Sequence, residues 1–166
     1  MSDFFTKTDL SRKDAESIIS ETLNNCDDGE LYLENSKSES IVLDDDKIKS
    51  SSYSSDLGYG LRAVTGEVVA YSHSNEISKK SLKQSASNLS STLKSQKGIY
   101  NHEIPQTNEK FYKDVNPIEE KSLQSKLDLL KEVNNYTRAK GGMVRQVTAS
   151  FAGEHKSIEI IRSGGE

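Results

Sequence analysis

Residues 30–73 read ELYLENSKSESIVLDDDKIKSSSYSSDLGYGLRAVTGEVVAYSH, and this stretch decides the fold because its apolar and polar residues alternate. Leu31 and Leu33 each stand between polar neighbours, as in a strand with one buried face. Turn chemistry at Asp44-Asp45-Asp46 and at Thr65-Gly66 separates successive strands. The stretch therefore predicts a meander of four or five short antiparallel strands.

Two hairpins are expected within this meander. The first has one strand ending at Ile41 and Leu43, the three aspartates as its turn, and a returning strand over residues 48–53. The second pairs residues 57–64 with residues 67–73. The connections between these short strands are expected to be tight.

A helix is expected on each side of the meander. Residues 12–25 show helical periodicity, with Ser11 as the N-cap. The second helix is predicted over residues 78–97, where Ser78 is a favourable N-cap and Leu82, Ala86, Leu89 and Leu93 form a narrow apolar stripe.

The last third of the chain predicts a linker, a third helix and a hairpin. Residues 98–116 show little periodicity and form the linker. Asn116 as N-cap and Pro117 at the first helical position start a helix that Gly141 ends. Its predicted core face consists of Leu123, Leu127, Leu130 and Val133. Residues 143–152 and 155–162 are expected to pair around Gly153-Glu154.

The expected fold class is α+β: a helix, an antiparallel meander, a helix, and then a second helix with a hairpin. Residues 1–97 form one predicted domain, residues 98–116 a linker, and residues 117–166 the start of a second domain. A lone helix and hairpin are too small to be stable. We therefore expect the second domain to be cut off partway.

Composition excludes several function classes. The net charge of −4 and the scattered lysines are unlike the clustered basic face of a nucleic-acid-binding protein. No stretch approaches the roughly 20 apolar residues of a membrane span, and the first residues do not resemble a secretory signal. Cys26 is the only cysteine. These features predict a soluble cytoplasmic protein that binds neither nucleic acid nor membrane.

The pair His102-Glu103 invites comparison with a zinc-binding helix. Such a helix needs a second histidine one turn later, but Gln106 and Thr107 occupy those positions, and Pro105 would break the helix. A polar linker is the favoured interpretation.

The other chemically suggestive residues have simpler interpretations. His73 and His155 are expected to be ordinary strand residues. Cys26, beside two aspartates, is expected to be inert. Asp44-Asp45-Asp46 favours a turn over a calcium loop. The glycines of Gly58-Tyr59-Gly60 are typical of a bulge or of close backbone approach, because no helix follows them. No catalytic or metal-binding residue is predicted.

Several motifs in order nevertheless resemble a known family. They are Asp28-Gly29-x-Leu31-Tyr32, Glu39-Ser40, Lys47-Ile48-Lys49, Ser52-Tyr53, Gly58-x-Gly60-x-Arg62-Ala63, Gly66-Glu67 and Ile77-Ser78, followed by Val115-Asn116-Pro117, Leu127-Asp128-Leu129-Leu130 and Gln146-Val147-Thr148-Ala149-Ser150. This pattern resembles the N-terminal part of the TldD/PmbA (TldE) family, and resembles TldD more than TldE.

The resemblance implies a role in a zinc-dependent peptidase that hydrolyses unfolded peptides. In this family, a TldD-type subunit carries the metal on an HExxxH helix of a C-terminal domain and pairs with a TldE-type subunit. The HExxxH motif is absent from this sequence. The resemblance therefore implies no cofactor in this chain, zinc in the full-length protein, and a non-catalytic role as scaffold or subunit interface, with self-association also open. The alternatives are a stand-alone truncated module that binds a TldE-type partner, and an unrelated α/β binding domain.

Three residues are candidates for an interface. Arg62 could donate an ion pair to another subunit or domain, although a solvated strand arginine is the commoner case. Tyr59 and Tyr71 could lie at an interface, where aromatic residues are enriched, or could fill one face of the sheet.

Overall fold

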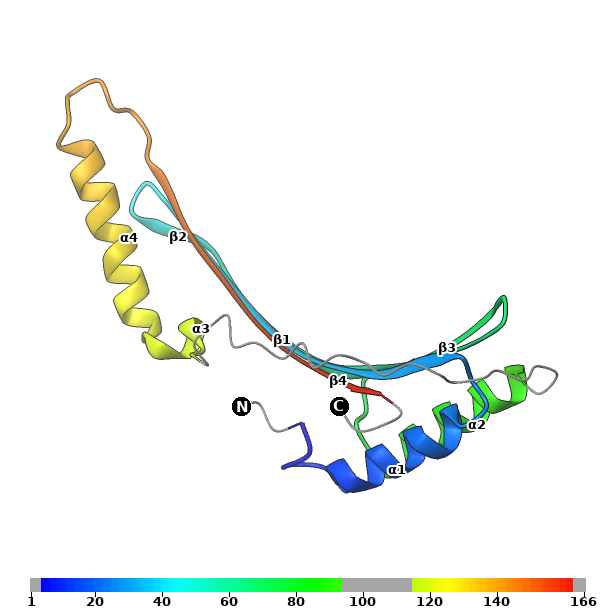
Figure 1. Ribbon diagram of the computed structural model, residues 1–166. Coiled ribbons are helices and arrows are strands. Elements are labelled where there is room, and N and C mark those ends of the chain that lie inside the picture. The colour runs from blue at the N-terminus through cyan, green and yellow to red at the C-terminus, as the bar shows by residue number, and fades with distance from the viewer. Residues whose placement is uncertain (1–3, 94–114, 163–166) are drawn as a thin grey trace. The chain divides into compact units, whose positions relative to one another are not determined.

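The structure is a computed structural model that describes residues 4–93 and 115–162. The predicted α+β class is confirmed: this part of the chain forms four helices and one antiparallel sheet with the strand order β3-β2-β1-β4 (Figure 1). In chain order the elements are α1 (Arg12–Leu23), β1 (Asp28–Asp44), β2 (Lys47–Thr65), β3 (Val68–Ser74), α2 (Lys79–Leu93), α3 (Pro117–Glu120), α4 (Leu123–Arg138) and β4 (Thr148–Arg162).

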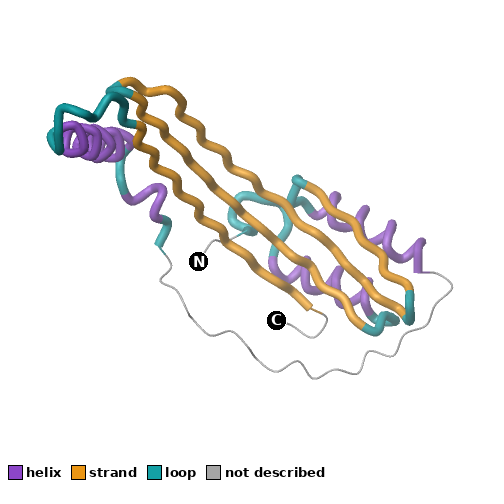
Figure 2. The backbone as a smooth tube through the Cα atoms, turned by 90° about the horizontal axis from the view of Figure 1, so that it is seen from above, coloured by secondary structure: helices purple, strands orange, loops and turns teal. Residues whose placement is uncertain are grey.

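The meander contains three strands instead of the four or five that were predicted. β1 has 17 residues and β2 has 19, so each is twice or more the expected length. The polar runs at residues 35–40 and 51–56 contain neither glycine nor proline, and their backbone stays extended. Figure 2 follows these long strands side by side. Backbone pairing with the neighbouring strand sustains a strand even where the side chains do not alternate.

Both predicted turns of the meander are confirmed. Asp45 and Asp46 adopt left-handed φ angles of 47° and 67° between β1 and β2. Aspartate tolerates this region better than most residues do. Gly66, with φ of 58°, turns the chain between β2 and β3, whose register runs from Thr65 opposite Val68 to Tyr59 opposite Ser74.

The chain divides into two compact units that each collect segments distant in sequence. Unit 1 comprises Met1–Asn35, Asp56–Phe111 and Ser157–Glu166, and unit 2 comprises Ser36–Ser55 and Tyr112–Lys156. β1, β2 and β4 contribute residues to both units. The predicted division into residues 1–97, 98–116 and 117–166 stays a prediction, since residues 98–114 of the predicted linker lie outside the described residues.

The core of unit 1 lies between the sheet and the helices α1 and α2, which cover one face of it (Figure 1). Its largest fully buried side chains are Leu10, Ile19, Leu23, Leu31, Leu33, Leu61, Leu82, Leu89 and Ile161. The predicted stripe of α2 is buried throughout. Alternation then places Tyr32 and Glu34 on the opposite face of β1, which neither helix covers.

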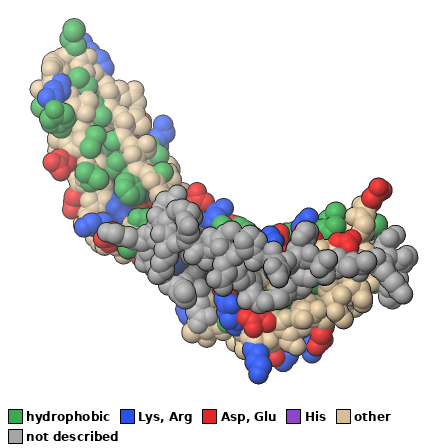
Figure 3. All heavy atoms as spheres, viewed as in Figure 1, with side chains coloured by type: hydrophobic (Ala, Val, Ile, Leu, Met, Phe, Trp, Pro, Cys, Tyr) green, Lys and Arg blue, Asp and Glu red, His purple; other side chains and the backbone are tan. Residues whose placement is uncertain are grey.

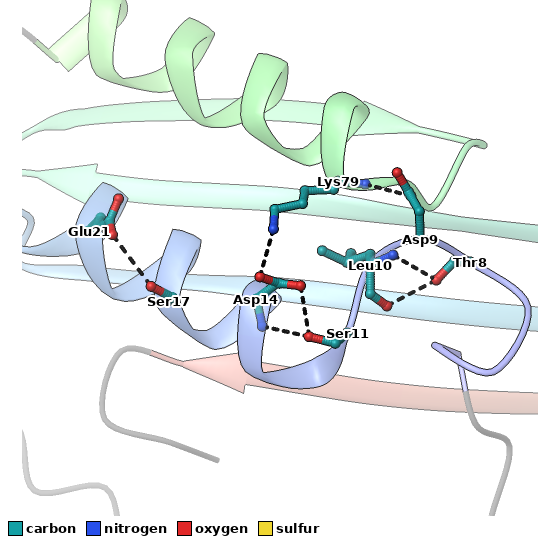
Figure 4. A network of polar contacts seen from close by, with 8 residues as sticks. All are labelled: Thr8, Asp9, Leu10, Ser11, Asp14, Ser17, Glu21 and Lys79. Atoms are coloured by element: carbon teal, nitrogen blue, oxygen red, sulfur yellow. Dashed lines mark hydrogen bonds and ion pairs between the residues drawn. The ribbon is translucent and has the colours of Figure 1, made fainter.

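The starts of α1 and α2 are tied together by polar contacts (Figure 4). The Ser11 hydroxyl accepts from the Asp14 amide at 3.1 Å, and the Ser78 hydroxyl accepts from the Ser81 amide at 3.1 Å, so both predicted caps are confirmed. Lys79 Nζ lies 2.8 Å from Asp14 Oδ1. The hydrogen bond from Lys79 holds the pKa of Asp14 below its usual value.

The third helix was predicted to be continuous, and this prediction is wrong because the structure has two helices there, α3 and α4. Its start is confirmed, because Asn116 Oδ1 accepts from the Ile118 amide at 3.0 Å. The helix then breaks at Lys121, which is extended, with φ of −114° and ψ of 139°. Ser122 caps a new helix by accepting from the Ser125 amide at 3.2 Å. Serine competes for backbone donors in this way and therefore favours a helix start over a helix interior.

The predicted core face of this helix is also partly wrong. Leu130 is buried as expected, but Leu123 and Val133 are exposed. Lys126 and Asn134 are buried in their place. The buried face of α4 is therefore rotated relative to the predicted one. Its two polar side chains have hydrogen-bonding partners inside unit 2.

The predicted hairpin at Gly153-Glu154 does not exist. Both residues lie within the single strand β4, which pairs with β1. A two-residue hairpin turn requires positive φ. Among the described glycines only Gly66 has a positive φ. Gly153 is therefore extended like its neighbours in β4.

Candidate functional site

The three predicted interface residues lie in unit 1, but they have different surroundings. Tyr59 is only 4% exposed, and its hydroxyl lies 2.9 Å from the hydroxyls of both Ser81 and Ser85 on α2. The Ser72 hydroxyl donates to Ser85 at 2.9 Å. Tyr59 therefore belongs to a buried hydroxyl network between the sheet and α2.

Arg62 belongs to an ion-pair network on the face of the sheet that α1 and α2 leave open. Its Nη1 lies 3.0 Å from Asp28 Oδ2 and 4.0 Å from Glu30 Oε1 on β1. Arg162 on β4 contributes a contact of 3.1 Å to Glu30 Oε2. Alternating charges thus connect β2, β1 and β4, and Arg62 finds its acidic partners within its own chain.

Tyr71 is 64% exposed on β3 and lies over Gly60. A Cβ atom at Gly60 would come within 2.5 Å of the Tyr71 hydroxyl oxygen, and one at Gly58 within 2.8 Å of the Ser74 carbonyl oxygen. The close backbone approach predicted for these glycines is confirmed at Gly58, whereas at Gly60 the close neighbour is the Tyr71 side chain. Tyr71 also stacks on His73, with ring centroids 5.9 Å apart.

A hollow of about 220 Å³ opens beside Tyr71, and three strands contribute to it. Its lining includes Tyr32 and Glu34 from β1, Gly58 and Gly60 from β2, and Tyr71 from β3. The Tyr32 hydroxyl donates to the Glu34 carboxylate, and this hydrogen bond raises the pKa of Tyr32 to about 12. The phenol is therefore neutral at physiological pH. The sequence analysis treated the glycines and Tyr71 separately and did not reveal this hollow.

Unit 2 contains a buried ion pair that sequence reasoning missed. The side chains of Lys126 and Glu39 are 5% and 10% exposed, and Lys126 Nζ pairs with Glu39 Oε1. The same ammonium donates to the Ile118 carbonyl oxygen at 2.6 Å and lies 5.7 Å from the centre of the Phe151 ring. Lys126 stands between Ser125 and Leu127 on an amphipathic helix, and these neighbours carry no local signal of its burial.

The aspartate turn between β1 and β2 is held by donors from α4 and from residues 146–148, which lie just before and at the start of β4. Asp44 Oδ1 accepts from Gln146 Nε2 at 2.9 Å and from the Thr148 hydroxyl at 2.8 Å. Asp45 pairs with Arg138 and accepts from the Val147 amide at 3.0 Å. The turn interpretation of the three aspartates is therefore confirmed.

Asp44 gives a pH prediction. The hydrogen bonds from Gln146 and Thr148 hold the pKa of Asp44 below its ordinary value of 3.8. The stability that Asp44 contributes is present above this value and is lost as pH falls through the lower folded pKa. In urea unfolding between pH 7 and pH 2.5, we expect Asp44→Asn to reduce the loss of stability below pH 4. An identical pH profile for the variant and the wild type would contradict this expectation.

The remaining residues singled out in the sequence do not assemble into a metal site. His73 and His155 lie in strands, and Cys26 is buried, with Sγ 3.8 Å from the Thr22 carbonyl oxygen. His102 and Glu103 lie outside the described residues. Within residues 4–93 and 115–162, no three His, Cys, Asp or Glu side chains come close enough together to hold a metal ion.

The exposed surface of unit 2 includes apolar side chains on α4. Leu129, Val133 and Tyr136 are exposed there, and hydrophobic side chains are visible along this helix in Figure 3. Lys140 Nζ lies 4.0 Å from the centre of the Tyr136 ring. No helix in the described part of the chain is long and apolar enough to span a membrane.

Comparison with known structures shows that the fold is shared. A structure from Bacteroides thetaiotaomicron, described as a candidate modulator of DNA gyrase, superposes with a TM-score of 0.64 at 18% identity, covering 93% of this chain and 37% of that one. TldE from Thermococcus kodakarensis superposes with a TM-score of 0.59 at 15% identity, covering 92% and 35%. At these identities the likeness concerns the fold alone.

Sequence comparison is more specific. A Buchnera aphidicola protein named metalloprotease TldD homolog is 34% identical over 140 residues, which are 84% of this chain and 29% of that protein. Its namesake from Haemophilus influenzae is 31% identical over 147 residues, 85% of this chain and 30% of that protein. The chain thus spans about 30% of the length of these relatives. Residues 29–92 match the family model of PmbA/TldA metallopeptidase domain 1, and through this N-terminal domain the chain belongs to the PmbA/TldD family.

Proposed function

We propose that this chain is the N-terminal, non-catalytic portion of a TldD-like zinc metalloprotease subunit and acts there as scaffold or subunit interface. The match of residues 29–92 to domain 1 of the family carries this proposal. The full-length protein would hydrolyse peptide bonds of unfolded peptides with zinc-activated water. The described residues offer no donor set for zinc, so we derive no metal-dependent step for them.

The proposed partner is a TldE-type subunit, which would form a heterodimer with the full TldD-like protein. A protein of that name from Thermococcus kodakarensis shares this fold, which supports the pairing of two similarly built subunits. Self-association is the second option. Cys26, the only cysteine, is buried, so the chain needs no oxidising compartment, and we propose a cytoplasmic location.

Arg62 and Tyr71 are the proposed interface residues, because both side chains reach solvent on the open face of the sheet. Tyr59 is a poorer candidate in the isolated chain since its hydroxyl is engaged beneath α2. Tyr136 on α4 offers a matched control, because it has the same 64% exposure as Tyr71.

Light scattering after gel filtration tests the proposed interface. We expect the 166-residue chain to form a complex with a TldE-type subunit, or with itself, and Tyr71→Ala to weaken that complex more than Tyr136→Ala does. The chain alone should not hydrolyse an unfolded peptide when zinc is added. Hydrolysis that a chelator stops would contradict the non-catalytic role, and a chain that binds neither partner would contradict the interface role.

An immunoblot of the source cells distinguishes the two forms in which this chain could act. A band several times heavier than 18.4 kDa would support a portion of a protease subunit. A band at 18.4 kDa would favour the alternative, a stand-alone module that binds a TldE-type partner.

A further inference from the structure

β2 has a strand neighbour on both sides along only part of its length. β1 lies on one side of it, and on the other side β3 pairs with it from Tyr59 to Thr65. Residues 47–55 of β2, which belong to unit 2, have no strand on that other side within the described part of the chain. Every residue of this stretch is exposed, whereas Leu61 and Ala63, in the part that pairs with β3, are buried. We call residues 47–55 the free edge of β2.

The free edge lacks the features that protect most unpaired strands. It contains neither proline nor glycine, and residues 50–55 carry no charge. The other edge of unit 2 is different, because residues 154–156 of β4 carry a carboxylate, an imidazole and an ammonium group. On the free edge, Ile48 and Tyr53 are 54% and 58% exposed, so their side chains can pack against those of a neighbouring strand. The backbone N–H and C=O groups that point away from β1 pair in order only with an extended chain.

The N-terminal end of the free edge is positively charged. Lys47 and Lys49 are both exposed, and alternation places them on the same face of the strand. Lys47 has no ion pair with any described residue, and Lys49 Nζ lies 3.7 Å from Asp44 Oδ2. The aspartates of the adjoining turn already accept hydrogen bonds from α4 and from residues 146–148. An acidic group on an added strand would therefore meet at least one ammonium, that of Lys47, which lacks a counter-charge.

We propose that the free edge of β2 binds an extended segment of a separate polypeptide as an additional strand, with acidic residues of that segment facing Lys47 and Lys49. Main-chain hydrogen bonds would supply the affinity, and contacts with Ile48 and Tyr53 would favour apolar residues in alternation. The added strand is expected to run antiparallel to β2, as β3 does on the same side. Its acidic residues then stand at its C-terminal end.

A second copy of this chain fits the free edge less well than an acidic segment does. Within residues 47–55 a second copy offers two more lysines and no acidic residue, so the ammonium of Lys47 would stay without a counter-charge. An isolated apolar helix would leave the backbone groups of the edge unpaired. The inference rests on the edge alone and does not depend on the proposed function.

Hydrogen exchange and amide NMR of the full 166-residue chain test the site. The probe is the peptide Thr-Thr-Val-Thr-Thr-Ser-Glu-Val-Glu, blocked at both ends. One control peptide has lysine in place of both glutamates, and another keeps the glutamates but has proline at its second and fifth positions. We expect the probe to protect those amides of residues 47–55 that point away from β1, and we expect neither control to do so, because one repels the lysines and the other lacks backbone donors.

A charge variant separates this site from other attraction to acidic peptides. Lys47 is exposed, so Lys47→Gln should preserve the fold and raise the Kd of the probe about 2- to 5-fold, the effect of losing one exposed ion pair. Lys131→Gln is the matched control, because Lys131 is exposed on α4, and it should leave Kd unchanged.

Several outcomes would overturn the proposal. Equal binding of the proline peptide would show that backbone pairing is not involved, and equal binding of the lysine peptide would remove the role of the charges. Amides of residues 47–55 that are protected without peptide would mean that the chain itself covers the edge, or that a second copy does if protection rises with protein concentration. Protection of residues 148–156 instead would place the added strand on β4. Because the test uses neither a partner subunit nor hydrolysis, its failure leaves the proposed function untouched.

Discussion

Replacing Lys126 by methionine is expected to destabilise unit 2 by about 3–5 kcal/mol, the usual cost of breaking a buried ion pair from one side. Methionine fills much of the space of the lysine stem. It cannot neutralise Glu39, whose side chain is only 10% exposed, and it cannot donate to the Ile118 carbonyl oxygen. The effect therefore comes from an uncompensated buried carboxylate instead of from a cavity.

A double variant tests this reason. When Glu39→Leu is combined with Lys126→Met, both charges disappear, and much of the lost stability should return, because a well-packed apolar pair often replaces a buried ion pair at little cost. Lys131→Met is the matched control, since Lys131 is exposed on the same helix. Its effect should stay within about 0.5 kcal/mol.

Hydrogen exchange in mild denaturant is the appropriate measurement, because two compact units need not unfold in a single transition. Protection should fall for amides of residues 36–55 and 115–156 in Lys126→Met and recover in the double variant. If Lys126→Met were as stable as the wild type, the ammonium and carboxylate would not be a buried pair in solution.

Helix starts and turns were predictable because they depend on three or four neighbouring residues. Ser11, Ser78 and Asn116 each cap a helix as the sequence indicates. The left-handed turns at Asp45-Asp46 and Gly66 follow equally from local preferences for positive φ.

Strand lengths and the core face of α4 depend on residues far away in the sequence. Glu39 and Lys126 are 87 positions apart, so no pattern within the helix could show that Lys126 is buried. Residues 35–40 and 54–56 show no apolar alternation of their own and become strand through pairing with their neighbours. Gly153 was mistaken for a turn because glycine permits both conformations.

The candidate site shows the same limit. The sequence predicted a bulge or a close backbone approach at Gly58 and Gly60, and the structure shows a close backbone neighbour at Gly58 and the Tyr71 side chain at Gly60. The sequence could not show that Tyr32, Asp56 and Tyr71 line the same hollow, because this follows from the strand order β3-β2-β1. Tyr59 was grouped with Tyr71 as an interface candidate, although the two tyrosines face opposite sides of the sheet.

Gly29→Ala is expected to destabilise unit 1 by about 1–3 kcal/mol, the cost of overpacking a filled core. A Cβ at Gly29 would come within 2.8 Å of the Arg62 carbonyl oxygen and would also press on the Leu23 side chain. Leucine can change rotamer, but the carbonyl is backbone, so β2 itself must shift. Gly29→Val should cost more, because its two methyl groups need further space in the same place.

The control for Gly29→Ala is the same substitution at Gly153, which also lies within a strand. A Cβ at Gly153 meets its nearest neighbour, Ile118 Cγ1, at 3.5 Å, an ordinary contact. Alanine there should be neutral or should stabilise unit 2 by roughly 0.5–1 kcal/mol, because it reduces the entropy of the unfolded chain. Hydrogen exchange would report the effect of Gly29→Ala through amides of unit 1 and the effect of Gly153→Ala through amides of unit 2. Equal effects at the two positions would mean that strand propensity, and not the contact with Arg62, explains the glycine in the Asp28-Gly29-x-Leu31-Tyr32 motif.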